Sequence, residues 1–347
     1  MAISSDKLLN AIKLDLAGEY ADKVPTATKE NLTEVADILI EYPTLKNAML
    51  TRLVNKVGKS IIDNKVYQNR FKEFKKEMLP YGTSIEHIFT DIIKAKDFSE
   101  NFGSNQAESL LARQDNNNVG VQYVQKNYEV KWKETISDVV FKQAFTTQNG
   151  LYNMINAKVQ AVINSTEFNE ELAINGVLNQ MPMVEEVVTG YTDDVAGYKK
   201  FLTTIKALAL RLPICSNKYN VQGVHTWTNL EDMIIFMTPE LQAKIDVEYL
   251  ASIMHIEKAE IPNRIRTVEK FLKQKSTSDK SLIEDTNVLA KVIDKNAIQL
   301  RPTFEGQRVF DNGDQLITNM FWHRQGLCYG LSFVNAINVV KTKTTTT

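Results

Sequence analysis

The histidines and cysteines of this 347-residue chain are spaced too widely to predict a metal centre. None of the histidines stands in an HExxH pattern or beside carboxylates at metal-ligand spacing. They are His87, His225, His255 and His323. Neither cysteine belongs to a CxxC pair, which a zinc or dithiol site would need. We therefore expect no metal site, no cofactor, and ordinary core or surface roles for the histidines.

The common sequence motifs of catalysis are also missing. The chain has no GxSxG, no GxGxxG and no glycine-rich phosphate loop followed by Lys-Ser or Lys-Thr. The adjacent carboxylates Glu185-Glu186 and Asp193-Asp194 do not predict acid–base catalysis, because neighbouring residues on a strand or helix point in different directions. We predict no catalytic residue.

Composition and charge indicate an ordinary globular protein. Hydrophobic residues make up 43% of the chain and charged residues 24%, which is enough for a sizeable core. With 41 basic and 42 acidic residues the net charge is −1, so any contact with DNA would be local. The longest apolar run, Met233–Met237, is too short to span a bilayer. Two widely spaced cysteines and an N-terminus without a leader pattern predict a protein made and kept in a cytoplasm.

The sequence predicts both helices and strands, and these elements would position any functional residue. Apolar residues from Tyr128 to Trp132 alternate with charged ones, as in a strand with one buried face. Apolar residues then recur at helical spacing over about residues 148–179, which predicts one long helix. Another helical stripe runs from Phe201 and stops at Pro213.

The second half of the chain predicts several strands. Met233–Met237 should be a buried strand, followed by a helix that Thr238 caps and a second short helix from Asp246. Residues 298–309 suggest a pair of strands around Pro302 and Gly306, and the alternation from Leu327 to Val339 predicts one long strand.

Three amphipathic stretches before residue 58 predict N-terminal helices. Their apolar stripes run from Leu8 to Leu16, from Leu32 to Leu39 and from Leu45 to Leu53, and Pro43 separates the last two. We expect these helices to be arms that reach out from the molecule and not part of its core.

Residues 71–98 interleave charged side chains with single large hydrophobes on both sides of Pro80-Tyr81-Gly82. The pattern predicts two arms joined by a turn, and such arms cannot bury their own apolar side chains. An exposed apolar surface of this kind usually marks a contact, and another copy of the chain is the natural partner. The residues expected in this contact are Phe74, Leu79, Ile85, Ile88 and Phe89, with Lys72, Lys75 and Lys76 beside them.

The lysines of this stretch belong to a basic cluster between Lys65 and Lys76, which Glu73 interrupts. Phosphate binding is one interpretation of the cluster. Pairing between subunits explains it at least as well, because alternating charges set register and partner choice.

Several blocks of the sequence recur in the order and spacing of one known family. They are Leu53–Gly58, Pro80–Ile92, Ala144-Phe145, Ile163–Asn169, Leu202–Pro213, Leu230–Met254 and Leu331–Ala336. Across nearly the whole chain these blocks resemble the major capsid protein of small tailed phages of the phi-29 type. The resemblance implies an α+β fold of the HK-97 (Hong Kong 97) type.

The resemblance also implies a division of the chain into the parts of that fold. These are an N-terminal arm with helices (1–58), an extended loop (59–112), a peripheral domain (113–180 and 296–340), an axial domain (181–295) and a flexible tail (341–347). The predicted long helix would then be the spine helix of the peripheral domain.

The function that the resemblance implies is self-assembly. Hexamers and pentamers would form an icosahedral or prolate phage head around double-stranded DNA. The implied partners are other copies of the chain, a scaffolding protein, a portal or connector, a head fibre or other decoration, and the packaged DNA in non-specific contact, with no membrane. The protein would be assembled in the cytoplasm of the host bacterium and would reside in the virion capsid.

Two alternatives stay open at the level of sequence. The first is an encapsulin-like cellular nanocompartment shell of the same fold, which would enclose enzymes instead of DNA. The second is a hydrolase or nucleotide-binding enzyme whose site is formed by scattered residues such as His225, Asp232 and His323.

Overall fold

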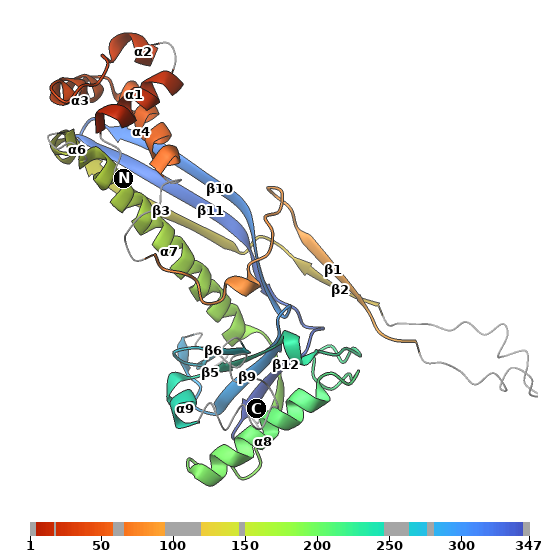
Figure 1. Ribbon diagram of the computed structural model, residues 1–347. Coiled ribbons are helices and arrows are strands. Elements are labelled where there is room, and N and C mark those ends of the chain that lie inside the picture. Colours follow the sequence, from red (N-terminus) through yellow and green to blue (C-terminus); the bar gives the residue numbers. More distant parts are fainter. Residues whose placement is uncertain are drawn as a thin grey trace, which may run out of the picture.

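The computed structural model describes residues 5–16, 19–57, 66–93, 119–145, 150–245, 264–275 and 281–342. The molecule has a helical end, a central sheet lined by a long helix, and a second sheet at the other end (Figure 1). A two-stranded ribbon leaves the side of the body near the junction of the two sheets (Figure 1). The predictions for the helix from Asp246, for Lys65, for His255, for the extended loop over residues 94–112 and for the tail over residues 343–347 lie outside the described residues.

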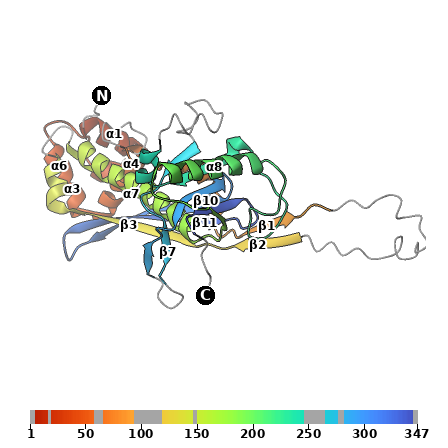
Figure 2. The ribbon, with the colours of Figure 1, turned by 90° about the horizontal axis from the view of Figure 1, so that it is seen from below.

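The central layer combines an antiparallel sheet with one long helix. Strands β10 (Ile298–Asn312), β11 (Ile317–Gly330) and β3 (Tyr128–Ser137) form the sheet in that order, so the predicted strand at Tyr128 is confirmed. Helix α7 (Gly150–Gln180) runs along one face of this sheet and confirms the predicted long helix (Figures 1 and 2). Its 31 residues span roughly 46 Å at a rise of about 1.5 Å per residue. The helix therefore connects the two ends of the molecule.

The second sheet has five strands, and each of its two faces packs against a separate apolar core. The strand order is β4 (Val184–Val187), β12 (Ala336–Val340), β9 (Val288–Asp294), β5 (Met233–Met237) and β6 (Ile265–Thr267). Every residue of β5 is buried, as its continuous apolar sequence predicted. One core contains apolar residues of α8 (Val195–Arg211), and the other contains apolar residues from the end of α7.

Short elements complete this end of the molecule. The 3₁₀ helix η3 (Leu230–Asp232) precedes β5, and α9 (Pro239–Lys244) follows it. The Thr238 side chain accepts a hydrogen bond from the Leu241 N–H at 3.5 Å and confirms the predicted cap. Strands β7 (Leu272–Gln274) and β8 (Leu282–Glu284) form a separate antiparallel pair.

The N-terminal helices are part of the core, so the prediction that they are outstretched arms is wrong. Helices α1 (Ser5–Asp15), α2 (Glu19–Lys23), α3 (Leu32–Glu41) and α4 (Pro43–Val57) gather at one end with α6 (Asp138–Phe145). Ile12, Val35, Leu39 and Leu53 have no exposed surface and share one cluster with residues of α6 and α7. Their apolar stripes are covered by the same chain.

Two predictions about the C-terminal strands are also corrected. The expected strand pair over residues 298–309 is one strand, β10, with a register shift between Pro302 and Phe304. A proline cannot donate a ladder hydrogen bond, so it locally disturbs the strand without ending it. The expected long strand from Leu327 to Val339 is divided, because residues 331–335 leave the central sheet and the chain continues as β12 in the second sheet.

Candidate assembly surface

The projecting ribbon consists of β1 (Ile85–Thr90) and β2 (Val119–Val124), which pair antiparallel along their whole length. The predicted turn exists, with Gly82 at a positive φ of 78° and a hydrogen bond from the Thr83 N–H to the Pro80 carbonyl. The two segments that it joins do not pair with each other, because β1 pairs with β2. The preceding segment follows β10 instead, where the Lys76 and Leu79 N–H groups donate to the Leu300 and Pro302 carbonyls, each at 2.8 Å.

One face of the ribbon is bound to the chain's own body. The Phe89 ring stacks on Phe333 with ring centroids 4.7 Å apart, and His87 Nε2 lies 2.9 Å from the Tyr329 hydroxyl. The Gln122 side chain donates to the Gly330 carbonyl at 2.8 Å. Burial, together with nearby Arg301, lowers the pKa of His87 and favours its neutral form. These contacts hold the inner face of the ribbon against the body.

The other face of the ribbon carries exposed apolar side chains. Ile88 stands opposite Val121, and Tyr123 and Val119 lie on the same face of β2. Ile88 is 64% exposed and Tyr123 is 71% exposed. Single apolar residues on a surface are normal, but several in adjacent cross-strand positions form a patch, and a patch usually marks a contact surface. We call these four residues the outer face of the ribbon.

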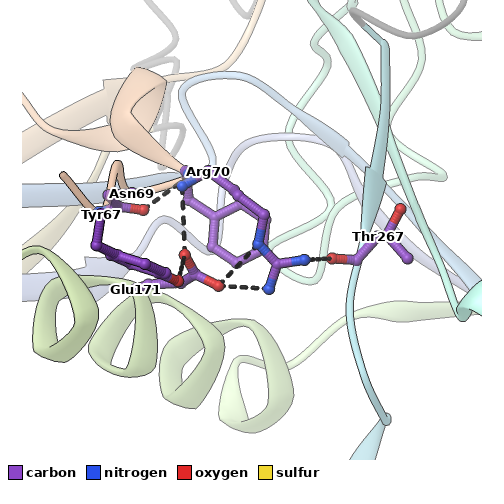
Figure 3. Close-up of polar contacts among 6 residues, drawn as sticks. Tyr67, Asn69, Arg70, Glu171 and Thr267 are labelled. Carbon is purple, nitrogen blue, oxygen red and sulfur yellow. Dashed lines mark hydrogen bonds and ion pairs between the residues drawn. The ribbon is translucent and has the colours of Figure 1, made fainter. Parts of the chain in front are cut away.

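The segment that precedes the turn and the ribbon is bound to helix α7. We call residues 67–75 the strap; they include the 3₁₀ helix η1 (Lys72–Phe74). The Tyr67 hydroxyl donates to Glu171 at 2.6 Å, and Arg70 Nε donates to the same carboxylate at 3.0 Å (Figure 3). Burial by itself would raise the pKa of Glu171, but the hydrogen bonds from Arg70 and Tyr67 hold that pKa below its ordinary value.

The neighbouring carboxylate, Glu170, is 1% exposed and holds the end of the strap. It pairs with Lys75 of the strap at 3.1 Å and with Arg324 of β11 at 2.6 Å. Burial raises the pKa of Glu170, and the two cations oppose that rise. Two consecutive glutamates of α7 therefore bind the strap, one to each of its ends.

The strap is also bound to β6, the edge strand of the second sheet. Arg70 Nη1 donates to the Thr267 carbonyl at 3.1 Å, and this bond is visible in Figure 3. Arg266 of β6 donates two hydrogen bonds to the Glu73 carboxylate, from Nε at 2.7 Å and from Nη2 at 2.8 Å. Paired nitrogen–oxygen contacts of this kind fix orientation as well as distance. The strap thus bridges α7 and β6.

The structure separates the predicted contact residues into three groups. Ile88 lies on the outer face of the ribbon, and Lys72 is exposed. The second group turns toward the chain's own body: Leu79, Ile85 and Phe89 pack there, while Lys75 pairs with Glu170 and Lys76 Nζ donates to Asn296 at 3.4 Å. The third group is Phe74 alone.

Phe74 cannot belong to a contact surface, and its assignment is corrected. It has no exposed area and packs with Phe71 against Phe236 of β5, whose ring centroid lies 6.1 Å from that of Phe74. Sequence reasoning also missed Val121 and Tyr123, which lie in the segment predicted to begin the peripheral domain. The alternation from Val119 to Val124 was the signal that could have found them.

The three residues of the enzymatic alternative have separate partners. His225 Nδ1 lies 2.8 Å from Asp91, Asp232 pairs with Lys295 at 2.5 Å, and the His323 ring stacks near Phe321 at 6.3 Å. Within the described ranges no group of three or more His, Cys, Asp or Glu side chains could hold a metal ion. In the same ranges no helix is both long enough and apolar enough to cross a bilayer.

A second surface lies on the face of the central sheet opposite α7. Residues directly opposite one another in antiparallel strands share a face, so Arg308, Phe321 and Lys133 form one row across the three strands. Lys131 lies in the next row, and Phe310 lies near the turn between β10 and β11. The two lysines, Arg308 and Phe310 are exposed. We call these five residues the open sheet face, which is basic and partly aromatic.

Comparison with known proteins assigns this architecture. The family described as Phi29-like phage major capsid protein matches residues 9–340. The chain belongs to this family. It is 25% identical to the major capsid protein of Bacillus phage B103 over 339 residues, covering 96% of this chain and 72% of that protein. It is 28% identical to the major capsid protein of Bacillus phage GA-1 over 331 residues, covering 90% of this chain and 65% of that protein.

Solved structures agree in fold. The chain is similar to a chain of the capsid of Staphylococcus phage Andhra, with a TM-score of 0.61, 13% identity and coverage of 82% and 87% of the two chains. It is also similar to a chain of the capsid of an empty GTA particle, with a TM-score of 0.51, 8% identity and coverage of 81% and 99%. The predicted α+β capsid fold is confirmed. The molecule is a capsid protein that assembles into multimeric phage capsids, and the nanocompartment alternative is not favoured.

Proposed function

We propose that copies of this chain assemble into hexamers and pentamers of a phage head by laying the outer face of the ribbon on the open sheet face of a neighbour. The observation that supports this most directly is the exposure of Ile88, Val121 and Tyr123 in the single chain. The inner face of the same ribbon is already satisfied by Phe333 and Tyr329. Only the outer face is therefore free to bind a second copy.

Apolar burial supplies the attraction in this proposal. Each Å² of apolar surface covered contributes roughly 25 cal/mol before the cost of ordering the partners. One ribbon is narrow and gains little alone. Around a closed ring every copy gives one ribbon and receives another, so the weak contact is repeated and the ring is stabilised by multivalency.

Charge supplies the register. Glu86 stands opposite Tyr123 on the outer side of the ribbon, whereas the open sheet face carries Lys131, Lys133 and Arg308. Opposite charges at the edge of an interface favour one docking position and add modest affinity.

We infer the remaining partners from family membership. They are a scaffolding protein, a portal or connector, a head fibre or other decoration, and packaged double-stranded DNA. A net charge of −1 favours local contacts with DNA over general polyanion binding. Assembly in the host cytoplasm and a purely structural, non-enzymatic role belong to the same proposal.

The test replaces the apolar centre of the outer face. We expect the double variant Ile88→Asp and Val121→Asp to remain folded, because both side chains are exposed, but to lose ring and particle formation. Negative-stain microscopy and sedimentation measure this loss. The matched control is Leu14→Asp, an 87% exposed apolar residue of α1, which should still assemble. Undiminished particles from the double variant would refute the role of the ribbon.

A further inference from the structure

The strap stands at a junction of three parts that an assembling subunit has to hold in fixed relation. It leads into the ribbon through residues 76–84, which follow β10 and turn at Gly82; it lies on helix α7, and it reaches the edge strand β6 of the second sheet (Figures 1 and 3). Arg70 contacts both α7 and β6. Its side chain contacts Glu171 of α7 and the carbonyl of Thr267 in β6.

The guanidinium group suits this position for geometric reasons. Its five N–H donors lie in one plane and point in fixed directions, so one arginine can bind two acceptors on different elements without rotating. Nε and Nη2 face the Glu171 carboxylate, and Nη1 faces the Thr267 carbonyl on the other side. A lysine has a single ammonium group and cannot hold both partners in a fixed plane.

The surroundings of Arg70 make its role more than that of a surface ion pair. Glu171 is 3% exposed, so its charge needs partners, and all of the partners we identify for it come from the strap. Half of the Arg70 side chain is nevertheless exposed, which means that it contributes little apolar core. A second link, between Glu73 of the strap and Arg266 of β6, also joins the strap to the second sheet.

We propose that Arg70 is a positioning residue for assembly, which fixes the exit direction of the ribbon relative to the spine helix and the second sheet. This inference rests on the proposed function, because a fixed direction matters only if the ribbon binds a neighbour. Closing the proposed hexamers and pentamers requires each copy to hold its ribbon within the narrow range of directions that reaches a neighbour, whereas a widely variable direction produces open or irregular assemblies. Loss of the Arg70 contacts should therefore change the shape of the assembly more than the stability of the subunit.

The experiment compares Arg70→Met, which keeps the length of the side chain and removes its five donors, with Arg70→Lys, which keeps the charge. We expect both variants to form fewer closed particles of the parent diameter than the unmodified chain, by about tenfold for Arg70→Met, because a weak repeated contact amplifies a small misalignment. Arg70→Lys should recover less than half of the closed particles, since charge without the planar fork cannot hold both partners. Electron microscopy gives the diameter distribution, and hydrogen exchange of residues 85–90 reports the order of the ribbon.

Controls separate positioning from stability and from the proposed function itself. Lys142→Met removes a surface ion pair, with Asp37 at 2.5 Å, far from the strap, and should leave the diameter distribution unchanged. If Arg70→Met fails to fold, Glu73→Gln decides the question, because that exposed residue supports only the second link to β6. Parent-like closed particles from a folded Arg70→Met, or from Glu73→Gln in that case, would overturn the inference. Failure of the unmodified chain to assemble would instead overturn the proposed function.

Discussion

Lys291 is a lysine enclosed in the interior, on the central strand β9 of the second sheet. It is 3% exposed, its Nζ donates to the Leu178 carbonyl at 2.7 Å, and it lies 5.6 Å from the centre of the Phe271 ring. Helix α7 has no basic residue in its own last turn, so Lys291 supplies from another element the cation that a helix C-terminus favours. The contact ties the spine helix to the second sheet at the cost of burying a charge.

The free-energy cost of burying the Lys291 charge depends on pH and can therefore be measured. Burial lowers the pKa of Lys291 from 10.5 to about 8, and the charge of Asp285 opposes this shift only in part. Between these values the unfolded chain binds more protons than the folded chain, so folding stability rises with pH from about 8 to about 10.5. We expect Lys291→Met to raise the free energy of unfolding by about 1–2 kcal/mol at about pH 7, because it removes a buried charge and keeps most of the volume.

The gain from Lys291→Met should shrink as the pH approaches about 10, where the parent lysine has become neutral. Urea unfolding of the unassembled subunit at both pH values measures the two differences. A variant that is less stable than the parent by the same amount at both pH values would show that the lysine stabilises the fold.

Residue roles could be predicted from sequence where local pattern decides them. The alternation around Trp132 and the uninterrupted apolar run of β5 both fix burial through the residues next to them in the chain. Phe74 is different, because its burial depends on Phe236 in a distant strand. The charged and apolar residues around Phe74 would look the same in an exposed arm and in a strap bound to the body. Local sequence therefore could not distinguish the two.

The prediction of helices and strands from local sequence has the same limit. Helix α7 was predictable because its length and spacing lie within one segment. The turn at Gly82 was predictable as well, but the pairing of β1 with β2 was not, because strand pairing is decided by register with a partner elsewhere in the chain. The prediction that the segments on both sides of this turn form the projecting arms placed the start of the projection too early. The same prediction moved Lys75 and Lys76 from the body to the projection.

The corrected boundary predicts which deletion the fold tolerates. Thr83 and Gln125 line the same pocket, so the two ends of the ribbon lie close together. Replacing residues 84–124 with a short Gly/Ser linker should leave a folded subunit that does not assemble, because Phe74 and the strap remain in place. Deleting residues 72–91 should instead unfold the subunit, since it removes the fully buried Phe74, and loss of a buried phenylalanine costs about 3–5 kcal/mol.

Thermal unfolding and sedimentation of the two deletions make this comparison. Equal stability of the two shortened chains would show that the strap is dispensable. Particles formed by the chain with the linker would show that assembly does not need the ribbon.

The described residues combine a body that has its own core with a projecting ribbon. The N-terminal helices, expected as arms, complete the core at one end, and the strap closes the junction at the other. The exposed apolar stripe of the ribbon and the open sheet face are the surfaces of the described residues that we propose to meet in a second copy. The ribbon surface is mainly apolar, whereas the open sheet face carries the cations. Apolar burial and charge pairing therefore make separate contributions to assembly, and the two respond differently to salt.

This difference predicts how assembly depends on ionic strength. The screening length falls from about 10 Å at about 0.1 M salt to about 3 Å at about 1 M, so edge charges such as Glu86 and Lys133 lose their influence while apolar burial persists. We expect particles to form at both concentrations, but more slowly and with more irregular shapes at high salt, since charge sets register. Light scattering gives the rate, and microscopy of the products gives the shapes. Complete loss of particles at about 1 M salt would mean that ion pairs supply most of the attraction, and the ribbon's apolar face would then be a minor part of the contact.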